Sequence, residues 1–550
     1  MGKMPIRKYS ELASKNASPT LIFSLPELSY PKNLNAVEVV LEGAIKKGWS
    51  DRTVYYSADH TYTFEKIREM VHQSMFAFRA LGVMPGDVVM LRMPDTVDLV
   101  VTLLALQAIG AIAMPTYIQL RSRDLIYRAE DSKAKFLITA LELLSEAVSV
   151  SATLGDKIKV VAFPFDREEQ LISYNQFLPN NEVEEKYAVT NAEELCLFLY
   201  TSGSTGKPKA TTHCHRDMLA VSDTYWRYCI APGPQDVFAG PPSIAFALGF
   251  GMFVYFPLRL GNAAVLEADK SPELALKQIQ KYSVTIFAAV TSYYNILARL
   301  IQDTGEKIPS LVHPMTGGEP LTSEVERFWN EVTNIPLEQF IGTTETLHCF
   351  VTSTQPLSPP KKATLGRIVP GYEAEILDPK TYVPVAEGQE GLLAIRGPTG
   401  TVYWNKPEQQ KKVVRDGWNV FQDIVWRDNE GYIHYVARYD EMIVSGGHNI
   451  SPVQVESVLM EHEAVVECAC VAAPDPNGKR GAVVKAYIVT NGEVMEDNSL
   501  ILSLQNFVKK NAPPYMYPRV ISFEKFLPKT INGKLLRSEL RKRAEAKITK

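Results

Sequence analysis

Short apolar runs rich in β-branched residues alternate with longer amphipathic segments over the first 430 residues of the chain. In one stretch, apolar runs at 87–93, 111–117 and 135–140 enclose the longer segments 98–110 and 122–132. Such runs are typical of buried parallel strands, and the segments between them have the length of crossover helices. The pattern therefore predicts an α/β fold with a parallel sheet.

The pattern changes after Tyr435. A polar turn, a short strand and a Gly-Gly loop lead to a helix that Ser451 and Pro452 would open, because helices favour Ser at the N-cap and Pro at the first position. Strands at 465–475 and 483–489, a helix at 499–511 and a basic end follow. We therefore expect a large N-terminal body of packed α/β subdomains, residues 1–439, and a small mobile α+β lid domain, residues 440–550.

Two apolar stretches of the chain are long enough to be compared with a membrane-spanning helix. Residues 99–114 are fewer than the roughly 20 residues that a span requires, and the stretch ends at Pro115, so we expect a buried core helix. Residues 237–258 are long enough, but Pro241, Pro242, Gly249, Gly251 and Pro257 interrupt them. An apolar segment interrupted in this way is more typical of the wall of a buried pocket than of a membrane helix. The N-terminus carries no apolar signal-peptide core, and we expect a cytoplasmic protein with no membrane partner.

The composition of the chain argues against nucleic-acid binding, a disulfide framework and a cysteine metal site. The 550 residues carry 58 Lys and Arg against 62 Asp and Glu, a net charge of −4. No broad cationic field for nucleic acid follows from that balance. Six cysteines in so long a chain form neither a disulfide framework nor a paired metal motif, which suits a reducing compartment. Cys468 and Cys470 alternate along one predicted strand, and we expect both thiols in the core.

The sharpest local motif follows the apolar run 195–200. It comprises Thr201, Ser202, Gly203, Ser204, Thr205, Gly206, Lys207, Pro208 and Lys209. Backbone N–H groups and hydroxyls in such a loop can surround a phosphate. The loop is not a Walker A motif, because Pro208 follows Gly206-Lys207 where Ser or Thr is required. On composition alone, a flexible surface turn is an equal alternative.

Further motifs follow this loop in a fixed order. They are 317–321 (GGEPL), 342–345 (GTTE), 418–423 (WNVFQD), 438–440 (RYD), 445–447 (SGG) and 527–534 (LPKTINGK). Together with the loop, they resemble the signature motifs of the acyl-adenylate-forming superfamily, which contains acyl-CoA ligases. The chain departs from the usual pattern at Ala210, Ile341 and Ala437. The segments 208–217 and 341–348, with Lys534, most resemble benzoate-CoA and 2-aminobenzoate-CoA ligases.

This resemblance implies a nucleotide site. Residues 201–209 would hold the ATP phosphates, Glu345 would hold Mg²⁺, and Lys534 would contact the carboxylate and the α-phosphate. Asp423 and Arg438 would bind the ribose, and Tyr435 would contact the base or simply lie half-buried in a strand. The adenine and phosphate region would be lined by Gly317, Gly318, Glu319, Pro320, Gly342, Thr343 and Thr344. Thr201, Glu345 and Lys534 are the predicted catalytic residues.

The resemblance also implies an acyl pocket and a hinge. The predicted pocket residues are Phe246, Ala247, Leu248, Gly249, Tyr293, Gly317, Gly342 and His348. His348 lies three residues after Glu345, so on a helix both would project to similar sides; a hydrogen-bonded core histidine is the alternative. Asp440 would be the hinge, and Ser445, Gly446 and Gly447 would border the channel for the CoA thiol.

The expected activity is ATP- and Mg²⁺-dependent activation of a small aromatic acid to an acyl-adenylate, and then transfer to CoA. We expect 2-aminobenzoate slightly ahead of benzoate. An adenylation enzyme that loads a carrier protein is one alternative, and a non-catalytic binder of nucleotide or acid is another. As partners, a homodimer, a carrier protein and a downstream CoA-using enzyme all stay open.

Overall fold

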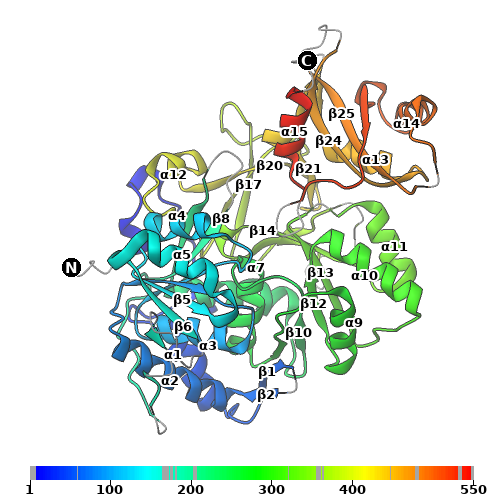
Figure 1. The fold of residues 1–550 in the computed structure, drawn as a ribbon. Coiled ribbons are helices and arrows are strands. Elements are labelled where there is room, and N and C mark those ends of the chain that lie inside the picture. The colour runs from blue at the N-terminus through cyan, green and yellow to red at the C-terminus, as the bar shows by residue number, and fades with distance from the viewer. Residues whose placement is uncertain are drawn as a thin grey trace.

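A computed structural model describes residues 8–58, 60–163, 172–173, 177–179, 183–201, 207–319, 321–354, 361, 364–445, 448–476, 482–492, 494–529 and 535–546. Two large sheets form the centre of the N-terminal body (Figure 1). The predicted succession of parallel strands and crossover helices is confirmed in both sheets.

The first sheet has seven strands and is parallel except for its last pair. Its order is β7 (Ile172–Ser173), β6 (Lys159–Phe163), β5 (Phe136–Ala140), β3 (Val88–Arg92), β4 (Ile112–Pro115), β8 (Leu195–Thr201) and β9 (Lys209–Cys214). The antiparallel pair, β8 and β9, brings the two ends of the Thr201 to Lys209 motif side by side.

The second sheet has nine strands, and its parallel centre is flanked by antiparallel strands at both edges. Its order is β16 (Arg367–Ile368), β15 (Cys349–Thr352), β14 (Glu338–Gly342), β13 (His313–Gly317), β12 (Ile286–Ala289), β10 (Val237–Ala239), β11 (Ala263–Val265), β1 (Thr53–Ser57) and β2 (His60–Thr63).

Helices cover both faces of the two sheets, so the body has layers of helix and sheet (Figure 1). Between the sheets lie α1 (Ala36–Lys46), α2 (Phe64–Leu81), α3 (Val97–Ala108), α6 (His215–Val221) and α8 (Phe256–Leu260). On the outer faces lie α4 (Ser122–Ser132) and α5 (Leu144–Leu154), and on the other side α9 (Pro272–Lys281), α10 (Thr291–Thr304) and α11 (Ser323–Thr333).

A smaller antiparallel sheet leads from the body toward the C-terminal unit. It comprises β17 (Glu373–Leu377), β18 (Gly391–Arg396), β19 (Val414–Arg415), β20 (Trp418–Arg427) and β21 (Ile433–Arg438), and α12 (Pro407–Val413) precedes β19. Asp423 and Arg438 lie opposite each other in the β20–β21 register.

The C-terminal unit is a small α+β domain at the upper right of Figure 1. It contains β22 (Ile443–Ser445), β23 (His448–Ile450), α13 (Pro452–Met460), β24 (Val465–Pro474), β25 (Ala482–Thr490), α14 (Asn498–Asn511), β26 (Val520–Phe523) and α15 (Arg537–Ala546). As predicted, Ser451 caps α13 by accepting a hydrogen bond from the N–H of Gln454. Cys468 and Cys470 are buried in one core cluster, which confirms the prediction for this strand.

Both apolar stretches form shorter elements than one continuous helix. The helix predicted over 99–114 is too long: α3 ends at Ala108, Gly110 turns the chain with a φ of 82°, and β4 begins at Ile112. The stretch 237–258 divides into β10, α7 (Ala247–Phe250), the π-helical turn η8 (Gly251–Tyr255) and the start of α8. Of the helices in the described ranges, none is both long and apolar enough to cross a membrane.

Candidate functional site

The carboxyl ends of strands from both sheets carry most of the predicted nucleotide residues. Thr201 ends β8 and pairs with Lys209 at the start of β9. The ammonium of Lys207 lies 5.2 Å from the ring centroid of Tyr127. The hydroxyl of Tyr127 donates a 2.9 Å hydrogen bond to the carbonyl of Pro208 and so anchors the segment that returns from the loop. Ser202, Gly203, Ser204, Thr205, Gly206, Pro320, Gly446, Gly447 and Lys534 lie outside the described residues.

Glu345 and Lys209 meet at Tyr403, a residue that the sequence did not point to. The Tyr403 hydroxyl donates a 2.7 Å hydrogen bond to Glu345 Oε1, and the Lys209 ammonium lies 4.5 Å from the Tyr403 ring centroid. Burial lowers the pKa of Lys209, although the nearby Glu345 carboxylate acts in the opposite direction. Burial and then Glu345 raise the pKa of Tyr403, which keeps the phenol protonated as a donor. The half-buried carboxylate is thus held in place from one side.

The turn that carries Glu345 is not the predicted helix. Residues Thr344–Thr346 form one 3₁₀ turn, η9, and the chain then reverses into β15, antiparallel to β14. The reversal needs a close backbone approach, because a Cβ on Gly342 would lie 2.5 Å from the carbonyl oxygen of His348. Leu347 takes a φ of 67°. Glu345 and His348 therefore do not share a helix face; they lie on either side of a tight turn.

His348 sits in a cage of aromatic rings. Its ring centroid lies 4.6 Å from that of Phe256, 5.6 Å from Tyr225 and 6.1 Å from Phe340, with which it is stacked. The side chain is 3% exposed, and neither ring nitrogen has a hydrogen-bond partner within the described part of the chain. Burial lowers the pKa of His348 to about 3, so the imidazole is neutral. His348 is therefore buried, as the alternative of a core histidine expects, but no described residue supplies the hydrogen bond of that alternative.

Two glycines let the cage close around His348. A Cβ on Gly251 would lie 2.3 Å from Phe256 and 3.0 Å from the His348 ring. A Cβ on Gly317 would lie 2.5 Å from the ring of Phe340. Gly251 belongs to η8, and Tyr225 belongs to a second π-helical segment, η7 (Ser222–Ile230). π-Helical turns occur often at functional sites.

The other predicted acyl residues lie on neighbouring elements. Ala247 and Gly249 are buried in α7, and Leu248 is half-buried beside them. Phe246 precedes α7 and lies 5.4 Å from Tyr117, centroid to centroid. Tyr293, in α10, donates its hydroxyl hydrogen bond to the carbonyl of Lys270 at 3.1 Å. The structure thus brings Gly317, Gly342 and His348 together, whereas the Tyr293 hydroxyl is already engaged by the backbone.

The carboxyl end of β13 supplies the predicted adenine segment. β13 and β14 are parallel, with Gly317 opposite Phe340, so their carboxyl ends meet at one edge. Gly318 takes a φ of 82°, which glycine adopts without strain. Glu319 Oε2 accepts a 3.0 Å hydrogen bond from the N–H of Ser292. Ligands of open α/β sheets bind outside the carboxyl ends of strands, as this arrangement allows.

Asp423, Arg438 and Asp440 form a charged row near the C-terminal unit. Arg438 Nη1 lies 3.8 Å from Asp423 Oδ2, and Arg438 Nε donates a 3.1 Å hydrogen bond to Asp440 Oδ1. Burial acts to lower the pKa of Arg438, but Asp423 and Asp440 together outweigh it and raise that pKa. Tyr435 is half-buried on the same strand, and burial and Asp423 raise its pKa.

The expected hinge is tied to the end of the chain. Asp440 lies in η10 (Tyr439–Glu441), and its carbonyl oxygen accepts a 2.8 Å hydrogen bond from Arg541 Nη1 on α15. The buried hydroxyl of Ser451 donates a 2.7 Å hydrogen bond to the carbonyl of Val436. Ser445 is buried at the end of β22. The bond of Ser451 holds the C-terminal unit against β21, and the bond of Arg541 joins the expected hinge to α15.

Comparisons with known proteins agree with this layout. Residues 43–404 match the family of AMP-binding enzymes, and residues 454–534 match the C-terminal domain of AMP-binding enzymes. A benzoate–CoA ligase of Thauera aromatica is 30% identical over 519 residues, which cover 94% of this chain and 97% of that enzyme.

Two solved structures are also similar. The anthranilate CoA ligase AuaEII in complex with anthranoyl-AMP superposes with a TM-score of 0.88 at 26% identity, over 96% of this chain and all of that one. A benzoate CoA ligase from Burkholderia xenovorans LB400 superposes with a TM-score of 0.82 at 26% identity, over 92% of this chain and all of that one.

Proposed function

The chain belongs to the family of AMP-binding enzymes and is an acid–thiol ligase, and from that premise we propose that it activates a small aromatic acid, 2-aminobenzoate ahead of benzoate. In the first step, a carboxylate oxygen attacks the α-phosphorus of ATP, and pyrophosphate leaves. In the second, the thiol of CoA attacks the acyl carbon, AMP leaves, and the thiol proton passes to solvent. The similarity to benzoate and anthranilate CoA ligases supports this assignment.

The first step brings two anions together. At about 4 Å and an effective dielectric constant of about 20, their repulsion costs roughly 4 kcal/mol. We assign the compensating charge to Lys207, Lys209 and Lys534. Burial and the Tyr403 ring already localise Lys209 beside the end of β8. The positions of Lys207 and Lys209 next to Thr201 support a phosphate site at this edge.

Glu345 is the residue that we assign to Mg²⁺. Magnesium is usually bound by one or two carboxylates together with substrate phosphates, so one positioned carboxylate is enough. The fit rests on the geometry of Glu345: one oxygen is fixed by the Tyr403 hydroxyl, and the side chain is half-buried near Lys209. When bound, the ion would neutralise phosphate charge. Tyr403 orients the carboxylate through its hydrogen bond.

The preference for 2-aminobenzoate rests on the unpartnered imidazole of His348. A buried polar group without a partner costs about 1–3 kcal/mol. A neutral imidazole has one acceptor nitrogen, and an ortho-amino group of the substrate can donate to it. Benzoate has no such donor and would leave that nitrogen unsatisfied. We therefore expect a preference of about 10-fold or more for 2-aminobenzoate, the ratio that corresponds to about 1.4 kcal/mol.

The test is a rate comparison over a panel of acids. Purified full-length enzyme with ATP, Mg²⁺ and CoA should form AMP fastest with small aromatic acids; faster turnover of an octanoate or longer alkyl acid would refute the activity. His348→Leu should reduce the ratio of kcat/KM for 2-aminobenzoate over benzoate to about one. His60→Leu, at an exposed position, serves as the control. An unchanged ratio in His348→Leu would remove the role of the imidazole.

We further propose that residues 440–550 rotate about Asp440 between the two steps. Lys534 would serve adenylation, and the segment of Ser445, Gly446 and Gly447 would then border the thiol channel. The small size of this unit and its polar contact with β21, from Ser451 to Val436, support a movable unit. An assay in which CoA and a phosphopantetheinylated carrier protein compete for the acyl group would show which of them is the acceptor. The free, buried state of all six cysteines is consistent with a cytoplasmic location, which we also propose.

A further inference from the structure

The chain between β18 and α12 adds a short edge segment, residues 401–403, to the first sheet. An antiparallel bridge joins Tyr403 to β9, and the N–H of Thr212 on β9 donates a 2.9 Å hydrogen bond to the carbonyl of Val402. The backbone groups of successive residues beside a strand point to alternate sides. Those of Thr401 and Tyr403 are therefore directed away from β9, to the open edge of the sheet.

A buried glutamine occupies this open edge. Gln410 belongs to α12 and is 3% exposed. Its Oε1 accepts a 2.9 Å hydrogen bond from the N–H of Tyr403, and its Nε2 donates a 2.7 Å hydrogen bond to the carbonyl of Thr401. A carboxamide carries the same donor and acceptor as a peptide group. Gln410 therefore satisfies both backbone groups as a neighbouring strand would.

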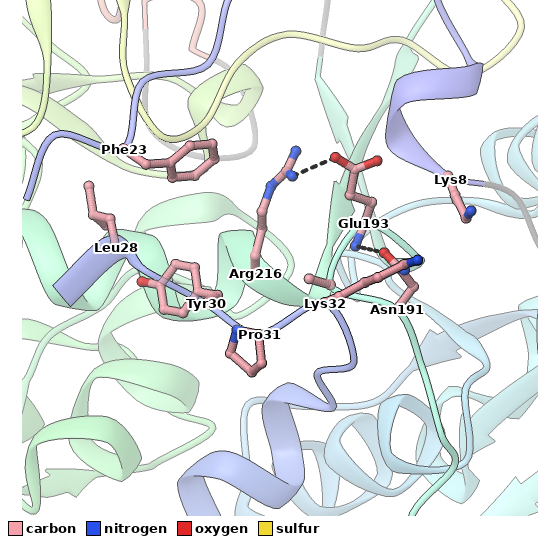
Figure 2. A pocket seen from close by; sticks show the side chains of 10 residues that line it. Lys8, Phe23, Leu28, Tyr30, Pro31, Lys32, Asn191, Glu193 and Arg216 are labelled. Carbon is pink, nitrogen blue, oxygen red and sulfur yellow. Dashed lines mark hydrogen bonds and ion pairs between the residues drawn. The ribbon is translucent and has the colours of Figure 1, made fainter. Parts of the chain in front are cut away.

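The same carboxamide also holds the N-terminal segment of the chain. Its Nε2 donates a second hydrogen bond, of 2.8 Å, to the carbonyl of Ala17. Figure 2 shows Phe23 and Tyr30, further along that segment, lining a pocket of about 380 Å³ together with Arg216, which follows β9. A flip of the Gln410 carboxamide would exchange its donor and its acceptor and would break all three hydrogen bonds. Its orientation is thus fixed from two sides.

The backbone that Gln410 holds carries the hydroxyl that contacts Glu345. The Tyr403 hydroxyl donates its hydrogen bond to Glu345 Oε1 at 2.7 Å, and hydrogen bonds between oxygens weaken beyond about 3 Å. A small shift of Tyr403 would therefore release the carboxylate. The backbone of the turn has its own support, because the Thr399 hydroxyl donates to the carbonyl of Thr346. Gln410 thus bears on the direction of the Glu345 carboxylate and not on the fold of its turn.

We propose that Gln410 is a positioning residue of the Mg²⁺ site, which acts through Tyr403 on Glu345. The inference rests on the proposed function in one respect, the assignment of Glu345 to Mg²⁺. Residues that orient a metal ligand typically contribute about 10-fold or more, and Gln410 stands one contact further from the ion, so we expect an effect of about 5-fold.

The experiment measures pyrophosphate exchange by the full-length enzyme over a range of Mg²⁺ concentrations. Gln410→Met keeps the length of the side chain and removes its three hydrogen bonds. The Mg²⁺ concentration for half-maximal rate should rise about 5-fold, while the KM of the acid stays within about 2-fold of the wild type, because the loss acts on the metal ligand alone. Gln409→Met, at the exposed neighbouring position of α12, should match the wild type. In a Tyr403→Phe background, Gln410→Met should cause no further rise.

Three results would overturn the inference and leave the proposed function in place. The first is an unchanged Mg²⁺ requirement in Gln410→Met when Tyr403→Phe raises it. The second is a full further rise in the double variant, which would show that Gln410 does not act through Tyr403. The third is an equal rise in the KM of the acid, which would show general loosening.

A different result concerns the proposed function itself. If neither Glu345→Gln nor Tyr403→Phe changes the Mg²⁺ requirement, the assignment of Glu345 to the metal fails, and the inference fails with it. Should Gln410→Met not fold, Gln410→Ala takes its place with the same expected rise, because alanine is favourable within a helix.

Discussion

Glu324, on the body, faces a second carboxylate across the contact with the C-terminal unit, and we predict that this pair makes stability depend on pH. Glu324 is in the first turn of α11, and both of its carboxylate oxygens are closed to solvent without a hydrogen-bond partner in the described residues. Burial and then Glu461, at the end of α13, raise the pKa of Glu324 to about 7; Arg327 opposes this. The thiol of Cys468 on β24 also lies near Glu324.

Proton linkage gives the size and the sign of the change that Glu324 makes in the free energy of unfolding. The interval from an ordinary pKa near 4.5 to about 7 is worth roughly 3 kcal/mol. Solvent around the exposed part of the Glu324 side chain screens this interaction and reduces the cost to about 1–2 kcal/mol. Between these two pH values the folded state keeps a proton that the unfolded state has lost. Stability therefore falls as pH rises through this window and is level above it.

Glu324→Gln removes the titrating group but keeps the shape of the protonated acid. We expect the variant to equal the wild type near pH 4.5 and to be more stable by about 1–2 kcal/mol at pH 8. Urea unfolding from pH 5 to pH 8.5 measures the difference. Glu461→Gln should recover part of the gain. Glu331→Gln removes an exposed carboxylate of the same helix and should follow the wild type. Parallel pH profiles for wild type and Glu324→Gln would refute the reasoning.

Two predictions concern catalysis. Tyr403→Phe should raise the Mg²⁺ concentration needed for pyrophosphate exchange by about 10-fold or more, because residues that orient a metal ligand typically contribute that much; an unchanged Mg²⁺ dependence would separate Glu345 from the metal. Lys534→Ala should slow adenylate formation by about 100-fold or more while retaining most of the thioester step from supplied aroyl-adenylate. Equal loss of both steps would contradict the assigned division of labour.

Local patterns predicted the elements of the fold better than their contacts. The strand 465–474 and the cap at Ser451 depend on alternation and on one hydrogen bond within a few residues, and both were predicted. The turn at Glu345 was not predicted, because a residue distant in the sequence stabilises it. The hydroxyl of Thr399, which follows β18, donates a 2.8 Å hydrogen bond to the carbonyl of Thr346. Tyr403 was missed for the same reason. Its bond to Glu345 joins positions 58 residues apart.

The buried histidines show why the surroundings of His348 could not be predicted from the sequence. His213 and His348 stand between small or apolar residues in the chain and His215 precedes Arg216, and all three are buried. His213 Nε2 lies 3.2 Å from the hydroxyl of Thr211, and His215 Nδ1 accepts a 3.2 Å hydrogen bond from the N–H of Ala36. His348 has neither kind of contact among the described residues. The difference comes from aromatic rings on three separate elements, and it leaves His348, of these three, with both ring nitrogens unpartnered among the described residues.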